Sequence, residues 1–201
     1  MEFASESGIL NLIFSGVHCS GKTTRSKLAY SVLRKAGFAI EYRTDNIRSC
    51  PYPLNEQGSY ISQKWILSFF RERDLKETNC DIVIMDRCSI DTIPYTLYLY
   101  EKGRITRKEC DLLVQEAKEI YYQISGKKIV FYCEPLPLVD DGFRSVDEEY
   151  RSFIVTKFEY ALRFIPDRIV RISNISEDFF IMVLFESLKE TRIRRSTQAN
   201  H

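Results

Sequence analysis

The chain contains 201 residues, of which 44% are hydrophobic and 28% are charged. This length accommodates one domain with a substantial core and is too short for two domains of ordinary size, so we expect residues 1–201 to form a single domain. The formal net charge of +1 excludes a bulk electrostatic attraction to nucleic acid or to a membrane surface, although it leaves room for a local basic patch.

Six cysteines occur without a C-x-x-C pair and without a histidine at metal-ligand spacing. Cys80 and Cys133 lie beside strand-like runs, so we interpret them mainly as buried thiols, which suits a reducing compartment. Residues 1–7 are acidic and lack the basic and apolar regions of a signal peptide. No apolar run approaches the roughly 20 residues that a bilayer-spanning helix needs. We therefore expect a cytoplasmic protein with no membrane partner.

The most informative stretch begins with an apolar run from Leu10 to Phe14, which predicts a strand buried on both faces. Residues 16–23 then read GVHCSGKT and match the phosphate-binding loop (P-loop) template G-x-x-x-x-G-K-[ST] at every fixed position. From Lys22 to Lys35 the chain has no Gly or Pro and has apolar residues at helical spacing, with a stop signal at Gly37. A strand before the loop and a helix after it are the context that the template requires, so we predict a nucleotide-phosphate loop.

A polyphosphate needs many hydrogen-bond donors in a small space. Glycines let backbone N–H groups approach it closely, and the N-terminus of the following helix adds a partial positive charge. In this interpretation Lys22 contacts the β- and γ-phosphates and the Thr23 hydroxyl binds Mg²⁺. His18 and Cys19 occupy variable positions, and we expect them to contribute through the main chain. The predicted phosphate-binding residues are Gly16, His18, Cys19, Ser20, Gly21, Lys22, Thr23 and Thr24.

A second strand is predicted over residues 38–42, followed by a polar run and then by two prolines that prevent regular structure. Ligands bind at the carboxyl ends of strands in a parallel α/β sheet. Glu41, Arg43 and Asp45 are therefore candidates to face an acceptor beside the P-loop. The alternative is a solvated loop without such a role.

A long helix is predicted over residues 60–76, with Asn55 or Ser59 as its cap. Its many large apolar residues suggest a helix that is covered over much of its girth. We expect its aromatic side chains, including Trp65, to pack in the core or in a subunit interface such as that of a homodimer, rather than to stack on bases.

Residues 82–85 form an apolar run that ends in an acid, the pattern of a buried parallel strand that delivers a carboxylate to the sheet edge. Asp86 is our candidate to hold Mg²⁺, because this metal takes few protein ligands and keeps several waters. Arg87 is a candidate to neutralise the transferring phosphoryl group or to hold the acceptor. The alternative is a strand-end ion pair without catalytic value.

A helix is predicted from Asp91, as its N-cap, to about Gly103, with Pro94 close enough to its start to be tolerated. The capping box from Thr106 to Glu109 predicts a further helix to about Ser125, which we interpret as architectural. Three tyrosines of the first of these helices are predicted to form one wall of the acceptor site: Tyr95, Tyr98 and Tyr100.

A fourth strand is predicted over residues 128–133, followed by a polar segment that contains Gly and leads into a helix. Arg144 and Arg151 are seven residues apart in this segment, a spacing that places both on the same side of a helix. A mobile lid over residues 138–151 would bring this charge over the bound nucleotide and exclude water. The alternative is a surface turn whose arginines pair with the adjacent acids.

The last predicted strand covers residues 168–172, and residues 173–174 lie at its carboxyl end, where an adenine could rest. Ser176 is predicted to cap a closing helix. The tail over residues 192–201 is basic and polar, and we expect it to be flexible.

Three segments resemble P-loop kinases of the nucleoside and nucleotide kinase type, and they look most like small ATP-binding (AAA-type) proteins that resemble the nicotinamide riboside kinase domain. These segments read GVHCSGKTT, IVIMDRCSIDTIPY and DDGFRSVDEEYR, the last being similar to an Asp-Gly-x-Arg lid. The resemblance implies a three-layer α/β/α fold with a parallel sheet of about five strands. It also implies MgATP as phosphoryl donor, with Asp86 at the metal or the acceptor and Arg144 in the lid.

Two departures limit what the resemblance implies about the acceptor. The chain lacks the Arg-Glu-Pro-Gly run of thymidylate kinases after the second strand, and it has no clear Glu-Arg-Ser as in deoxynucleoside kinases. We therefore assign to this chain neither the substrate of thymidylate kinases nor that of deoxynucleoside kinases. From position alone, Glu41 or Asp45 is assigned as the general base that accepts a hydroxyl proton.

The leading functional hypothesis is phosphoryl transfer from ATP to a small nucleoside-like or nucleotide acceptor. A second hypothesis is a nucleotide-binding switch that presents the aromatic helix over residues 60–76 to a partner, although the Asn-Lys-x-Asp pattern of GTPases is absent. A third is a kinase that acts on nucleic acid, which would need a basic groove that the net charge does not indicate.

Overall fold

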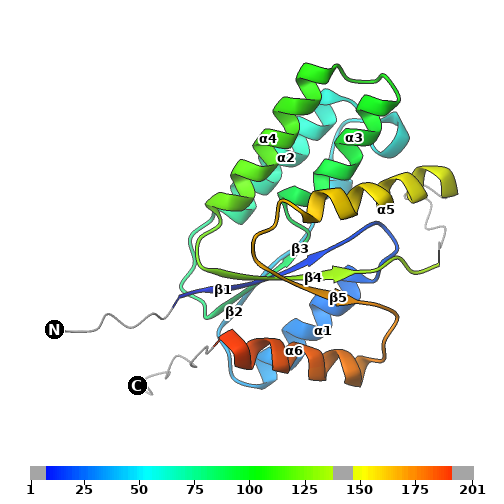
Figure 1. Ribbon diagram of the computed structural model, residues 1–201. Helices are drawn as coiled ribbons and strands as arrows, with labels where there is room; N and C mark the ends of the chain where they lie inside the picture. Colours follow the sequence, from blue (N-terminus) through cyan, green and yellow to red (C-terminus); the bar gives the residue numbers. More distant parts are fainter. Residues whose placement is uncertain (1–7, 138–146, 192–201) are drawn as a thin grey trace.

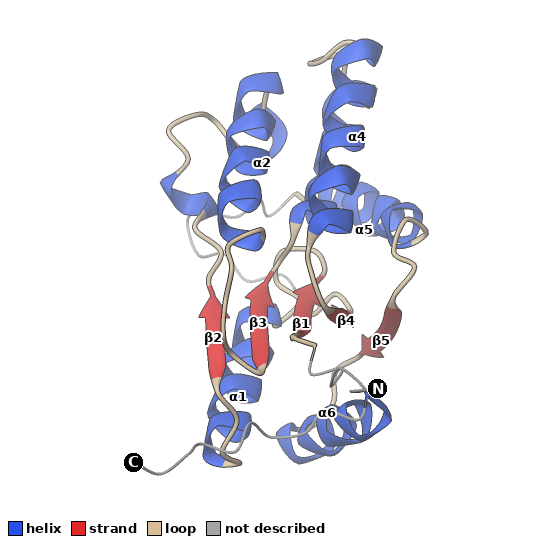
Figure 2. Ribbon diagram, turned by 90° about the vertical axis from the view of Figure 1, so that its left-hand side faces the viewer, coloured by secondary structure: helices blue, strands red, loops and turns tan. Residues whose placement is uncertain are grey.

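The computed structural model describes residues 8–137 and 147–191. Five parallel strands form one sheet in the order β2-β3-β1-β4-β5 (Figure 2), which confirms the predicted α/β class and strand number. The strands are β1 (Leu10–Ser15), β2 (Ile40–Arg43), β3 (Ile82–Asp86), β4 (Lys127–Cys133) and β5 (Arg168–Ile172).

Helices cover both faces of the sheet and make three layers, as Figures 1 and 2 show. One face carries α1 (Lys22–Lys35) and α6 (Glu177–Thr191). The other face carries α2 (Tyr60–Asp74), α3 (Ile93–Glu101), α4 (Arg107–Gln123) and α5 (Glu148–Leu162). Three short 3₁₀ turns complete the described elements: η1 (Ile47–Ser49), η2 (Asn55–Gln57) and η3 (Ser89–Thr92).

The central strand shows why its sequence is continuously apolar. Successive side chains of β1 point to opposite faces, so Ile13 packs in the cluster under α2 to α5, whereas Leu12 and Phe14 pack in the cluster beside α1 and α6. Phe14 stacks on Phe131 of β4 at 5.1 Å and meets the edge of Phe180 of α6 at 6.2 Å. Both faces of the strand are therefore buried.

Helix α2 begins where one of the two predicted caps lies. Ser59 is its N-cap and accepts a hydrogen bond from the Ser62 backbone N–H, whereas Asn55 lies in η2. The helix is less enclosed than predicted: Leu67 is fully buried, but Ile61 is 56% exposed. One side of α2 therefore faces outward.

None of the six cysteines, all of which lie in the described residues, forms a disulfide; Cys133 is buried as predicted, whereas Cys80 is only half-buried. Among the helices of the described residues, none is both long enough and apolar enough to cross a bilayer.

Candidate active site

The P-loop connects the end of β1 to the start of α1, and both of its template glycines are structurally required. Gly16 has φ +140°, and a Cβ there would overlap the carbonyl oxygen of Cys133. Gly21 has φ +74° and immediately precedes α1. A residue with a side chain would be strained at either position, so the loop depends on glycine at both.

Lys22 is buried in this loop and is held by the loop itself. Its Nζ donates to the carbonyl oxygen of Val17 at 2.6 Å and to Ser20 Oγ at 3.2 Å. Burial lowers the pKa of Lys22 to about 7, and the nearby charge of Arg87 also lowers it, against smaller opposing effects that include Asp91. A bound polyphosphate would place negative charge beside Lys22 and would thereby favour the charged form of its side chain.

Asp91 lies in the turn that follows β3 and forms hydrogen bonds to the start of the P-loop. Its Oδ1 accepts hydrogen bonds from Ser15 Oγ and from the Gly16 backbone N–H, both at 3.0 Å, and its Oδ2 accepts one from the Cys88 backbone N–H at 2.9 Å. The prediction that Asp91 is an N-cap of the next helix is wrong, because α3 begins at Ile93 and Asp91 lies in η3. Since β3 pairs with β1, the turn after β3 lies beside the loop after β1.

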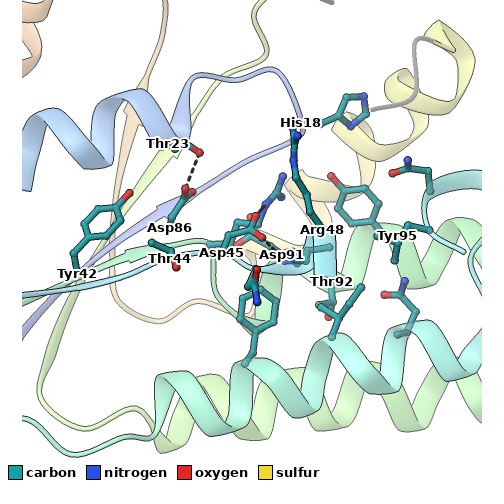
Figure 3. A pocket seen from close by; sticks show the side chains of 18 of the residues that line it. His18, Thr23, Tyr42, Thr44, Asp45, Arg48, Asp86, Asp91, Thr92 and Tyr95 are labelled. Atoms are coloured by element: carbon teal, nitrogen blue, oxygen red, sulfur yellow. Dashed lines mark hydrogen bonds and ion pairs between the residues drawn. The ribbon is translucent and has the colours of Figure 1, made fainter. Parts of the chain in front are cut away.

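Thr23 and Asp86 form a pair of oxygen donors between α1 and β3. The Thr23 hydroxyl donates to Asp86 Oδ2 at 2.6 Å (Figure 3), and the buried Oδ1 of Asp86 accepts no hydrogen bond from the described residues. A hydroxyl beside a carboxylate with one open oxygen suits a hard cation such as Mg²⁺. The two residues predicted from sequence for this role therefore fit it.

Arg87 and Asp45 form a second pair beside the P-loop. Arg87 Nε donates to Asp45 Oδ2 at 2.7 Å, and its Nη1 donates to the Gly16 carbonyl oxygen at 3.3 Å. Burial opposes the charge of this guanidinium, but Tyr95, Asp45 and other acids outweigh burial and raise the pKa of Arg87 above its ordinary value. The backbone of Arg87 has φ +67°, a conformation that is uncommon for a residue with a side chain.

A cavity of about 430 Å³ opens beside these two pairs, at the carboxyl ends of β2 and β3. In Figure 3, Thr23, Asp86 and Tyr42 lie toward one end of the cavity, and Thr92 and Tyr95 lie toward the other. The lining residues are His18, Thr23, Lys27, Tyr42, Thr44, Asp45, Asn46, Ile47, Arg48, Leu54, Asn55, Gln63, Ile66, Phe70, Asp86, Arg87, Asp91, Thr92 and Tyr95.

Two predictions about this cavity need correction. Of the three tyrosines predicted to form its wall, Tyr95 lines it, whereas Tyr98 packs on Tyr150 at 4.6 Å and Tyr100 is exposed. The His18 side chain, for which only a main-chain role was predicted, also lines the cavity and stacks on Tyr150 at 6.0 Å.

Glu41 and Arg43 lie away from the cavity. Glu41 pairs with Arg43 at 3.1 Å and with Lys76 at 3.7 Å, and Arg43 is buried against the end of α2. Side chains alternate along a strand, so these two point away from Tyr42, whose hydroxyl meets Ser26 Oγ of α1 at 2.7 Å. The structure thus places Asp45, but not Glu41 or Arg43, beside the predicted phosphate site.

The predicted lid is described in part. Arg144 and the rest of residues 138–146 lie outside the described residues. Arg151 lies near the start of α5, and its Nη2 donates to the carbonyl oxygens of Cys19, at 3.3 Å, and of Leu136. Arg151 therefore contacts the P-loop main chain.

The structure also describes other residues of the predicted phosphate and nucleotide site. Ser20 is buried in the loop, and Thr24 lies exposed in the first turn of α1. At the end of β5, the Ser173 carbonyl oxygen accepts a 2.8 Å hydrogen bond from Arg25 of α1. Residues 173–174 are therefore tied to the helix that follows the P-loop.

Sequence analysis missed several residues that surround the cavity, and they share no motif. Some come from α2, which was assigned to packing or to a partner surface, and others come from η3. The missed lining residues include Gln63, Ile66, Phe70, Asp91 and Thr92, and Arg73 contacts the backbone of the lining residue Asp86. For the α2 residues, the only signal was that this helix follows the polar run after the second strand.

Comparison with known proteins gives a likeness in structure alone. No protein-family model matches the chain, and no curated protein matches it. A thymidylate kinase from Ehrlichia chaffeensis is similar, with 20% sequence identity, a TM-score of 0.64 and coverage of 90% of this chain and 99% of that chain. A deoxyadenosine kinase from M. mycoides with bound dCTP is similar too, with 16% identity, a TM-score of 0.63 and coverage of 90% and 99%. A structure of that kinase with the products dCMP and dCDP has 15% identity, a TM-score of 0.63 and coverage of 90% and 100%. At these identities the likeness establishes a shared fold.

Proposed function

We propose that the chain is a kinase-like domain that transfers the γ-phosphoryl group of MgATP to a small nucleoside-like or nucleotide acceptor. The observation that carries this proposal is the position of the 430 Å³ cavity, which is lined by Thr23 and Asp86 of the metal pair and by Arg87 and Asp45. A phosphate group bound to the P-loop would lie at the border of this cavity. Transfer to a bound acceptor needs such an adjacent, partly enclosed space, whereas hydrolysis needs only a positioned water.

On the donor side, the backbone of residues 16–21 and Lys22 would bind the β- and γ-phosphates. Thr23 and Asp86 would hold Mg²⁺, which would neutralise negative charge on the phosphates when bound. Arg144, outside the described residues, is proposed to add positive charge over the nucleotide, and Arg151 to support the loop through Cys19.

On the acceptor side, we assign Asp45 rather than Glu41 as the general base. Asp45 lines the cavity and lies 2.7 Å from Arg87 Nε, and its Oδ1 accepts a hydrogen bond from the Ile47 backbone N–H at 2.8 Å. These contacts orient the carboxylate, as the acceptance of a hydroxyl proton by a general base requires. Arg87 would then face the charge that develops during transfer.

The wall formed by α2 and α3 suits a planar heterocycle. Phe70 and Tyr95 offer aromatic surface, and the buried Gln63 amide offers both a donor and an acceptor. The kinases with the same fold act on nucleosides or nucleotides, as their names state, and this supports the same class of acceptor here. Nicotinamide riboside belongs to that class and is included in the test below.

The test is a mass-spectrometric screen with MgATP and a panel of nucleosides, nicotinamide riboside, mononucleotides and short oligonucleotides. We expect a product that is heavier by one phosphate, formed by the wild type and not by Lys22→Ala. Asp111→Asn, a surface change on α4, serves as the matched control and should retain the activity. If no acceptor is phosphorylated while ATP still binds through Lys22, the kinase proposal is wrong and a nucleotide-binding switch takes its place.

A further inference from the structure

Arg73, in the last turn of α2, joins the ends of two neighbouring strands. Its Nη1 donates to the carbonyl oxygens of Thr44 and Asp86, both at 3.0 Å, and its Nη2 donates to that of Arg87 at 2.6 Å. One guanidinium thus binds three main-chain carbonyls from the chain segments that end β2 and β3.

These contacts lie where the backbone pairing of the two strands stops. The last register pair between β2 and β3 is Arg43↔Met85, and the next would be Thr44 opposite Asp86. At that position Arg73 bridges the two carbonyl oxygens in place of a direct strand-to-strand hydrogen bond. The strands are therefore held together at the edge of the cavity by a side chain from a third element.

The guanidinium itself is firmly held. Its Nε donates to Asp74 Oδ1 at 2.6 Å, and the side chains of Arg73 and Asp74 are 10% and 0% exposed. The Phe70 ring, which lines the cavity, lies 4.7 Å from the guanidinium carbon. A planar fork with five donors can satisfy these partners together, and a lysine ammonium at this position cannot.

The three bound carbonyls belong to Asp86, to Arg87 and to the residue before Asp45. We propose that Arg73 is a positioning residue that sets the spacing between Asp45 and the Asp86–Arg87 segment, and thereby between acceptor and metal. This inference rests on the proposed function for its catalytic meaning, but the strand bridge can be tested without any substrate.

The first measurement is hydrogen exchange of the whole protein, with Arg73→Lys as the deciding variant because it keeps the charge and the aliphatic stem. We expect exchange in peptides that cover residues 42–49 and 86–89 to rise about tenfold, as loss of one to two hydrogen bonds implies, with β1 and β4 unchanged. The matched control is Arg71→Lys, on the same helix, where Arg71 is 41% exposed and pairs with Glu116 at 3.6 Å. Unchanged exchange near residue 44, or an equal rise in every strand, would overturn the proposal.

The second measurement uses an acceptor found in the screen. Arg73→Lys should bind MgATP within about twofold of the wild type while kcat/KM for the acceptor falls about a hundredfold, because a misplacement of about 1 Å has that effect. In Arg73→Ala, added guanidinium ion should restore part of the activity. Faster local exchange with unchanged acceptor kinetics would make Arg73 merely structural and would overturn the proposal. A wild type that phosphorylates no acceptor would refute the proposed function, while the exchange result would still decide the strand bridge.

Discussion

The hydroxyl of Thr23 and the carboxylate of Asp86 lie 2.6 Å apart and join the first turn of α1 to the last residue of β3. The register that pairs Phe14 of β1 with Asp86 brings the end of β3 level with the start of the P-loop. Because Oδ1 of Asp86 is buried and accepts no hydrogen bond from the described residues, the pair has one oxygen ready for a cation.

We expect Asp86→Asn to weaken binding of MgATP about 10- to 100-fold and to leave binding of metal-free ATP little changed. The variant removes the charge that attracts Mg²⁺ but leaves the P-loop donors intact. Titration calorimetry with and without Mg²⁺ measures both affinities. Equal weakening under both conditions would show that Asp86 supports the loop rather than the metal.

Nucleotide binding should be coupled to proton uptake through Lys22. Burial lowers the pKa of Lys22 to about 7 in the unliganded loop, whereas bound phosphates favour the charged form and raise it. At about pH 8 most of the free protein therefore carries a neutral lysine, and binding should take up close to one proton; below about pH 6 uptake should vanish. Calorimetry in two buffers of different ionisation enthalpy measures the number of protons taken up on binding. Lys22→Arg stays charged and should show no such uptake, and equal uptake by both proteins would contradict the assignment.

Local sequence patterns predicted the secondary structure around the P-loop well. The P-loop template fixes backbone geometry as well as residue identity, so β1, the loop and α1 follow within a residue. Asp86 was found for a similar reason, because an apolar run that ends in an acid indicates a buried parallel strand. Both patterns are contiguous in the chain.

The surroundings of the cavity were predicted less well because they depend on contacts between distant segments. Gly16 and Asp91 are separated by 75 residues and Thr44 and Arg73 by 29, and no local pattern marks either pair. Glu41 and Arg43 share one face of β2 because side chains alternate along a strand, but only the pairing of β2 with β3 defines which face that is.

Asp91→Asn should destabilise the P-loop by removing a buried charge that three donors share. Hydrogen bonds to a charged acceptor contribute about 1.5–3 kcal/mol, so we expect a loss of that order in the free energy of unfolding, together with weaker ATP binding. Urea unfolding and nucleotide titration test the two effects. Glu119→Gln, an exposed change on α4, is the matched control. An unfolding midpoint equal to that of the wild type would refute the anchoring role of Asp91.

Asp74 should make the stability of the fold depend on pH in the sense opposite to that of an ordinary ion-paired carboxylate. Burial raises the pKa of Asp74 from 3.8 to about 6, against the opposing effects of Arg73 and Arg43. A raised folded-state pKa gives a stabilising contribution that is complete below pH 3.8 and is lost as the pH rises through about 6. Asp74→Asn cannot titrate, so its unfolding free energy minus that of the wild type should increase by about 2 kcal/mol between about pH 4 and about pH 7. Urea unfolding of both proteins across this range measures the difference. A difference that shrinks with rising pH would mean that the ion pair with Arg73, rather than burial, dominates the titration of Asp74.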